Sequence, residues 1–144
     1  MIHMGYAPYY SRFFKGYLDK RKDNLNIVEF GIFKGIGLAI LSDCFPNSNL
    51  YGFDINLDNF KENKDFLVYQ GAFKKNKIEI YECDQLNITN QWLQNKVQNI
   101  KFDIVIDDGF HSIEAIKNTA TSIKPLMKKE IYILLRTIFL LRKV

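Results

Sequence analysis

Cysteine is scarce in this chain of 144 residues, and its two cysteines, Cys44 and Cys83, lie far apart. Their separation matches neither a disulfide framework nor the short spacing of zinc and redox sites. Stable disulfides are typical of oxidising compartments, so we expect two reduced thiols in a cytoplasmic protein. The N-terminus also lacks the apolar core and small-residue cleavage site of a signal peptide.

Long apolar runs and a strong charge excess are lacking as well. The apolar run near the C-terminus, IYILLRTIFLL, contains Arg136 and is shorter than the roughly 20 residues that cross a bilayer. The net charge is +4 and the lysines are scattered, so nucleic-acid binding is not indicated. By contrast, 47% of the residues are hydrophobic and 15% are aromatic, which suffices for the core of one domain.

Strand and helix patterns alternate along the chain. Runs of β-branched and aromatic residues predict strands, and apolar residues at helical spacing predict helices. The expected strands are residues 25–31, 49–55, 77–84, 102–108 and 130–135, and the expected helices are residues 37–45, 90–99 and 112–127. The polar stretch at residues 57–66 is expected to be a loop.

The helix expected at residues 112–127 has a defined start and a defined inner face. Ser112 is a suitable N-cap. Helical spacing places four apolar residues on the face toward the core, namely Ile113, Ile116, Ala120 and Ile123.

The alternation predicts parallel βαβ units with right-handed crossovers. Near-continuous apolar strands predict a sheet that is covered on both faces. The expected fold class is therefore α/β, with a Rossmann-like, doubly wound and mostly parallel sheet. Residues 1–144 are expected to form a single domain, in which residues 1–22 are a helical segment laid against the rest.

Glycines and an acid follow the first expected strand, in the sequence EFGIFKGIG. In open α/β sheets, ligands bind beyond the carboxyl ends of the strands. Gly31 and Gly35 permit a tight turn that a ligand can approach closely, and the next helix N-terminus offers N–H groups to an anion. Glu29 is costly in a buried strand unless a cationic ligand or a backbone amine partners it. The alternative is an ordinary glycine turn beside a surface glutamate.

Asp54 ends the second expected strand, about 20 residues after Gly35. An acidic residue at this distance accepts the ribose hydroxyls in nucleotide-binding folds. The alternative is an aspartate that caps a turn, but the preceding glycine turn favours the ribose. Residues 54–65 also resemble a calcium loop, yet Asn59 replaces the glycine and Asp65 the glutamate that such loops need. We interpret them as a polar loop.

Polar residues follow the third and fourth expected strands too. Asp84 and Gln85 are suited to the polar edge of a base. Asp107 and Asp108 repel each other, so a cation or hydrogen-bond donors should lie nearby. Oxygen ligands suit magnesium, and His111 suits a general base. The alternative is a helix start, where aspartate stabilises the helix dipole and His111 is simply exposed.

The segments VEFGIFKGIG, YGFDI, CDQ and FDIVIDDGFH together resemble the class I S-adenosylmethionine-dependent methyltransferases. More narrowly, the chain is similar to the metal-dependent sugar O-methyltransferases of the macrocin and mycinamicin type. The resemblance covers nearly the whole chain, including GYAPYYSRFF near the N-terminus. The first two motifs are generic to the class, whereas the element IDDG-x-H is more specific.

This resemblance implies a cofactor, a reaction and a role for each residue. Asp108 would be a magnesium ligand, and His111 the base that takes a proton from a sugar hydroxyl of a small molecule or glycan. The residues implied to bind S-adenosylmethionine are Glu29, Gly31 and Gly35 at the methionine part, Asp54 at the ribose hydroxyls, Asp84 and Gln85 near the adenine, and Asp107.

The chain departs from this family at two places. Phe110 stands where the family usually has serine. After the fifth strand the family has a Glu-Asp pair that completes the metal site, and two further strands follow. This chain instead has Leu134, Leu135, Arg136 and Thr137. We therefore expect the C-terminal strands of the methyltransferase fold to be missing, magnesium to be weakly bound or lost, and activity to be weak or absent.

A reading-frame change near residues 128–130 is our hypothesis for this departure. Residues 134–137 can be encoded as TTA TTG AGG ACT, which contains ATT GAG GAC, or Ile-Glu-Asp, in another frame. The residue usage, rich in Lys, Asn, Ile, Phe and Tyr, fits an AT-rich gene. The hypothesis is wrong if no shifted frame downstream of Pro125 continues the fold.

Two other functions stay open. One is a nucleotide-binding Rossmann domain with a nicotinamide cofactor, although the chain lacks G-x-G-x-x-G and has a glutamate before the first glycine. The other is a non-catalytic fragment or interaction module. Because an uncovered sheet edge promotes association, a homo-oligomer is also among the expectations.

Overall fold

Five strands form one parallel sheet in the order β3-β2-β1-β4-β5. The computed structural model describes residues 15, 19, 23–128 and 133–135. The strands are β1 (Asn26–Phe30), β2 (Asn49–Asp54), β3 (Ile78–Glu82), β4 (Ile104–Asp107) and β5 (Ile133–Leu135). The helices are α2 (Ile36–Cys44), α3 (Asp58–Tyr69), α4 (Asn90–Val97) and α5 (Ile113–Ile123), with a short 3-10 helix, η2 (Lys124–Leu126), after α5.

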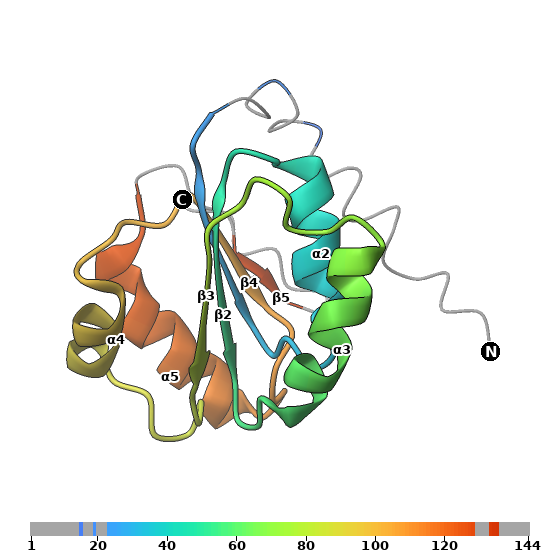
Figure 1. Cartoon of the computed structure of the whole chain (residues 1–144). Coiled ribbons are helices and arrows are strands. Elements are labelled where there is room, and N and C mark those ends of the chain that lie inside the picture. The colour runs from blue at the N-terminus through green and yellow to red at the C-terminus, as the bar shows by residue number, and fades with distance from the viewer. Residues whose placement is uncertain (1–14, 16–18, 20–22, 129–132, 136–144) are drawn as a thin grey trace.

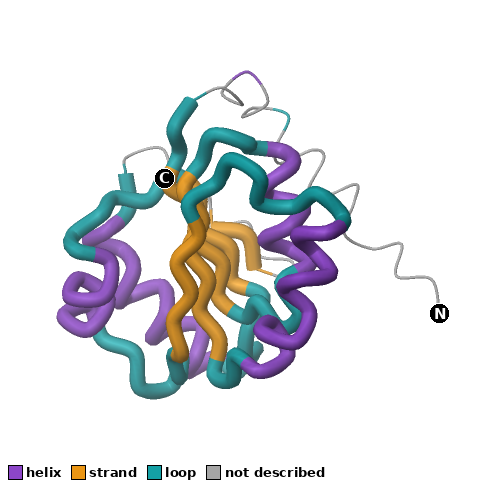
Figure 2. The backbone as a smooth tube through the Cα atoms, viewed as in Figure 1, coloured by secondary structure: helices purple, strands orange, loops and turns teal. Residues whose placement is uncertain are grey.

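Helices cover both faces of this sheet. α2 and α3 lie on one face, and α4 and α5 lie on the other (Figures 1 and 2). Side chains of β1 alternate between two apolar clusters, as the pleat of a strand requires. Ile27 packs with Leu38 of α2, whereas Phe30 belongs to the cluster that contains Leu93 of α4 and Ile123 of α5. The predicted doubly wound α/β fold is confirmed.

Some predictions about the two ends of the chain fall outside the described residues. Of residues 1–22, expected to form a helical segment, only Lys15 and Asp19 are described. The prediction that no further strands follow the fifth concerns residues 136–144, which lie outside the described residues. Among the described residues, no helix has the length and apolar character to cross a membrane. Cys44 and Cys83 are both free thiols, as predicted.

The loop predicted at residues 57–66 is wrong, because α3 spans Asp58–Tyr69. Two of its apolar residues, Phe60 and Leu67, are buried, and residues seven apart lie on the same face of a helix. The polar residues between them form the solvent-exposed face. The stretch that resembles a calcium loop therefore enters a helix at Asp58 instead of forming a polar loop.

The inner face of α5 also differs from the prediction. Ser112 does cap the helix, since its hydroxyl accepts a hydrogen bond from the N–H of Ala115 at 3.1 Å. However, Ile113 is 74% exposed. The buried residues of α5 are Ala115, Thr119, Ser122 and Ile123. Thr119 turns inward, where its hydroxyl accepts a hydrogen bond from Gln85 at 2.8 Å, and apolar periodicity cannot reveal such a partner.

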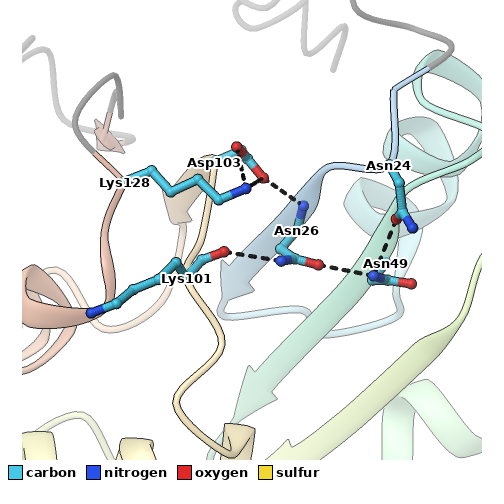
Figure 3. A network of polar contacts seen from close by, with 6 residues as sticks. All are labelled: Asn24, Asn26, Asn49, Lys101, Asp103 and Lys128. Carbon is cyan, nitrogen blue, oxygen red and sulfur yellow. Dashed lines mark hydrogen bonds and ion pairs between the residues drawn. The ribbon is translucent and has the colours of Figure 1, made fainter.

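A polar network joins β1, β2 and β4 near their amino ends (Figure 3). The backbone N–H of Asn26 donates to Asp103 Oδ2 at 2.9 Å, and Lys128 Nζ donates to the same oxygen at 2.7 Å. The Asn26 side chain donates to the Lys101 carbonyl at 3.0 Å and accepts from Asn49 at 2.9 Å. These contacts fix three neighbouring strands at the edge opposite their carboxyl ends.

We expect Asp103→Ala to lower the free energy of unfolding by about 2 kcal/mol. The substitution removes the acceptor of the Asn26 N–H and the partner of Lys128. Urea unfolding would measure the loss, with Lys61→Ala as the control. The Lys61–Asp58 pair spans 3.6 Å with side chains 67% and 71% exposed, so its removal should cost less than about 0.5 kcal/mol. Equal losses in both variants would contradict the role of Asp103.

Candidate functional site

The carboxyl ends of the first four strands meet at one edge of the sheet, toward the bottom of Figure 1. The register places Phe30 beside both Phe53 and Asp107, and it places Asp54 beside Glu82. The predicted site residues follow these strand ends in the sequence. The fold therefore brings them to a common edge, which is where ligands bind in open α/β sheets.

Gly31 lies where the backbone after β1 approaches the backbone after β4. Its φ is +82°, and a Cβ at this position would lie 2.5 Å from the carbonyl carbon of Asp108 and would also meet Gly109 Cα. The Asp108 N–H donates to the Phe30 carbonyl at 2.8 Å. The loop after β1 and the acidic turn after β4 are thus in direct backbone contact.

Gly35, the second predicted glycine, is the N-cap residue of α2. A Cβ at Gly35 would lie 2.5 Å from the ring of Phe60 and 3.2 Å from Leu67. Packing of α3 against this turn therefore explains the glycine from within the protein. Its contact with a cofactor stays a prediction.

Glu29 is a buried acid at this edge, with only 3% of its surface exposed. Its Oε2 has no hydrogen-bond partner among the described residues, and a Cβ on Gly37 would meet its Oε1. Burial raises the pKa of Glu29 to about 8, and the charges of Asp108 and Asp54 add to the rise, which the Leu38 backbone hydrogen bond opposes. A positively charged group beside this carboxyl would therefore be stabilised.

Asp54 holds the turn that follows β1. Its Oδ2 accepts a hydrogen bond from the Phe33 N–H at 2.8 Å, and its Oδ1 accepts one from the Asn56 N–H at 3.2 Å. Asp54 is thus a turn cap, which is the alternative that the sequence left open. Because each carboxylate oxygen has a further lone pair, the same side chain can also accept hydroxyl groups of a ligand.

Asp84 and Gln85 follow β3 but face different ways. Asp84 caps its own turn, accepting from the Leu86 N–H at 2.9 Å and from the Asn87 side chain at 2.7 Å. Gln85 is buried, and its amide donates to Asp107 Oδ1 at 2.9 Å. The Gln85 side chain therefore points toward the end of β4. The predicted proximity of both residues to an adenine is not tested by these contacts.

Asp107 and Asp108 have different surroundings at the end of β4. Asp107 is buried, which raises its pKa, while hydrogen bonds from Gln85 and Gly109 act in the opposite direction. Asp108 lies near His111, with 3.9 Å between Asp108 Oδ1 and His111 Nε2. The fold thus brings the predicted metal ligand and the predicted base close to each other.

The described residues do not make a complete metal site. They contain no group of three His, Cys, Asp or Glu side chains that could hold a metal ion. The register of β5 pairs Leu135 with Asp107. The role of Asp108 as a metal ligand stays a prediction.

Three residues that the sequence analysis did not single out shape this edge. Gly37 and Gly109 allow the Glu29 and Gln85 side chains to lie against the backbone, since a Cβ at either glycine would meet them. Thr119 accepts a hydrogen bond from Gln85. The two glycines stand inside the quoted motifs, which was a usable signal. The sequence offers no such signal for Thr119, because its inward position depends on a hydrogen bond from Gln85, which is 34 residues away.

At the level of sequence, no family model and no curated protein matches the chain. Solved structures do resemble it. MycE methyltransferase from the mycinamycin biosynthetic pathway, in complex with Mg, S-adenosylhomocysteine (SAH) and mycinamycin VI, is 21% identical with a TM-score of 0.67 over 92% of this chain and 35% of that chain. A Staphylococcus aureus protein assigned by name to the caffeoyl-CoA O-methyltransferases is 17% identical with a TM-score of 0.63, over 87% and 55%. The N-terminal domain of EvdMO1 with SAH bound is 16% identical with a TM-score of 0.58, over 85% and 48%.

The chain spans about a third of the length of MycE and about half of the length of the other two proteins. At these identities the likeness establishes the fold alone. The fold is the Rossmann-like α/β fold of S-adenosylmethionine-dependent methyltransferases.

Proposed function

We propose that this protein binds S-adenosylmethionine and transfers its methyl group to a hydroxyl group. The observation that carries the proposal is the buried Glu29, whose Oε2 has no partner among the described residues at the carboxyl edge of the sheet. S-adenosylmethionine carries an ammonium and a sulfonium group, and a cation is the partner that such a carboxyl lacks. The fold supports this choice, since MycE and EvdMO1 were solved with SAH.

The proposed cofactor contacts follow the strand ends. Glu29 would face the ammonium group, and Asp54 would accept the ribose hydroxyls through the lone pairs that its turn contacts leave free. The remaining proposed cofactor residues are Gly31 and Gly35 at the methionine part, Asp84 and Gln85 near the adenine, and Asp107.

His111 is the proposed base of the reaction. When bound, the cofactor supplies an electrophilic methyl group. His111 would take the proton that the acceptor hydroxyl loses as it is methylated, and Asp108, 3.9 Å away, would stabilise the imidazolium that forms. The proposed acceptor is a sugar hydroxyl of a small molecule or glycan, supported by the resemblance to sugar O-methyltransferases.

Magnesium does not fit the described residues as a complete site. Asp108 is the proposed ligand, but no group of three ligating side chains surrounds it in the described part of the chain. We therefore assign no step of the reaction to a metal ion. In the proposed proton transfer, His111 takes the proton and Asp108 stabilises the imidazolium.

Titration calorimetry with SAH and with NAD tests the proposed cofactor. We expect SAH to bind and NAD not to bind. Asp54→Asn should weaken SAH binding about tenfold, because a neutral amide is a poorer acceptor of ribose hydroxyls than a carboxylate. The control is Asp58→Asn, which changes an exposed carboxyl on α3 and should leave the affinity unchanged.

Two outcomes would contradict the proposal. Tighter binding of NAD than of SAH would favour a nicotinamide-binding domain. Binding of neither compound, or binding of SAH by a protein that shows no methyl transfer, would favour a non-catalytic fragment.

A further inference from the structure

Gln85 is a buried polar side chain that makes three hydrogen bonds inside the protein. It is 8% exposed. Its Nε2 donates to Asp107 Oδ1 at 2.9 Å and to Thr119 Oγ1 at 2.8 Å. Its Oε1 accepts from the Phe110 N–H at 2.8 Å. Both amide hydrogens and the carbonyl oxygen are therefore used within the protein.

The orientation of this amide is fixed by its neighbours. If the amide were turned over, its NH₂ group would face the Phe110 N–H, and two donors would oppose each other. Its carbonyl oxygen would then face the Asp107 carboxylate, and two acceptors would oppose each other. Only a side chain with a donor on one side and an acceptor on the other satisfies both partners. Glutamate has the same shape but would place a second carboxylate against Asp107.

The three partners of Gln85 enclose one short segment. Asp107 ends β4, Phe110 lies in the turn, and Thr119 lies in α5. The turn itself packs on the amide, since a Cβ on Gly109 would meet Gln85 Oε1 and lie 2.9 Å from its Cδ. The segment between β4 and α5 is therefore held before, within and after the turn by one side chain from another loop.

This segment contains His111, the base of the proposed reaction, and Asp108, the carboxylate that would stabilise its charged form. We propose that Gln85 is a positioning residue, whose buried amide fixes the turn after β4 and thereby sets the places of Asp108 and His111. The inference rests on the proposed function, because that function gives Asp108 and His111 their roles. The hydrogen bonds of Gln85 to Asp107, Phe110 and Thr119 are a property of the free protein. Both amide hydrogens and the carbonyl oxygen of Gln85 are used in hydrogen bonds inside the protein.

A competing explanation is that Gln85 merely stabilises the whole domain. The two explanations differ in which part of the protein loses stability when the Gln85 hydrogen bonds are removed. A positioning residue affects the turn far more than the sheet, whereas a general stabiliser affects all slowly exchanging amides together.

Amide hydrogen exchange measured by NMR separates these cases. The variant Gln85→Met keeps the length of the side chain and removes its hydrogen bonds. We expect the protection of the Phe110 amide to fall at least about tenfold more than that of the Val28 amide in β1. Gln91→Met, at an exposed glutamine of α4, is the matched control and should change neither amide.

A second variant keeps the test decisive if Gln85→Met does not fold. Thr119→Val removes one acceptor and leaves the contacts to Asp107 and Phe110 in place. It should loosen the Phe110 amide in the same direction but by a smaller factor.

The ring proton resonance of His111 gives a signature that a general stabiliser would not move. We expect it to shift in Gln85→Met while the indole resonance of Trp92 stays in place. His111→Gln assigns the signal, since the chain has only two histidines. Equal loss of protection at Phe110 and Val28, or an unmoved His111 signal in the folded variant, would overturn the proposal. Neither measurement uses cofactor or acceptor, so a failure of the proposed methyl transfer would leave this result standing.

Discussion

Gly31→Ala is expected to lower the free energy of unfolding by at least about 4 kcal/mol. The residue has a φ of +82°, and its Cβ would lie 2.5 Å from both the carbonyl carbon and the carbonyl oxygen of Asp108. These are backbone atoms of the turn after β4, so no side chain can rotate to make room. The strain of the positive φ adds to the overlap. Urea unfolding followed by circular dichroism would measure the loss.

Gly71→Ala is the matched control for this substitution. Gly71 also has a positive φ, of +101°, but a Cβ there would lie 3.3 Å from Lys74 Nζ, the mobile end of a flexible side chain. Its replacement should cost only the backbone strain, about 1 kcal/mol. Losses of similar size in the two variants would show that the contact between the two loops carries no special cost.

Glu29→Gln is expected to remove a large pH dependence of stability. Burial raises the pKa of this carboxyl from 4.5 to about 8. Between these values the unfolded chain releases the proton while the folded protein keeps it, so wild-type stability falls as the pH rises. The contribution is complete below about pH 4.5 and lost above about pH 8. The neutral amide of the variant has no such term.

The gain of the variant over the wild type should therefore grow with pH, by on the order of 5 kcal/mol across this range. Denaturant unfolding at a series of pH values would measure it. Asp107, whose pKa burial also raises, is present in both proteins, so the difference isolates Glu29. Glu62→Gln, at an exposed glutamate of α3, is the control and should follow the wild type. A pH-independent difference between Glu29→Gln and wild type would show that the pKa of Glu29 is the same in the folded and the unfolded protein.

The strands of this fold were predictable because burial on both faces demands near-continuous apolar sequence. The same rule failed for α3. A surface helix needs only a narrow apolar stripe, and α3 buries just Phe60 and Leu67, so its polar sequence resembles that of a loop. In α5 the predicted inner face is correct at Ile123, which is buried, and wrong at Ile113, which is exposed. The buried Thr119 is satisfied by a hydrogen bond inside the protein. Apolar spacing carries no information about such partners.

The candidate site was predictable in its location and less so in its internal contacts. Parallel strands bring their carboxyl ends to one edge, so residues such as Asp54 and Asp108 must come near each other. The pairings across that edge depend on register and side-chain direction. Neither the hydrogen bond from Gln85 to Asp107 nor the raised pKa of Glu29 can be derived from spacing, because both depend on burial in the folded protein.

The hydrogen bonds of Gln85 to the turn after β4 allow nearby exposed positions to vary in sequence during evolution. Gln85 holds Phe110 through its backbone N–H, and the Phe110 side chain is 62% exposed. Ile113, 74% exposed, begins α5 behind the cap that Ser112 provides. Neither side chain supports the backbone beside His111. These two positions can therefore vary in size and polarity while the turn keeps its shape, at little cost to the fold. A library built at Phe110 and Ile113 would mostly sample folded chains, whereas one built at Gly31 would mostly sample unfolded chains.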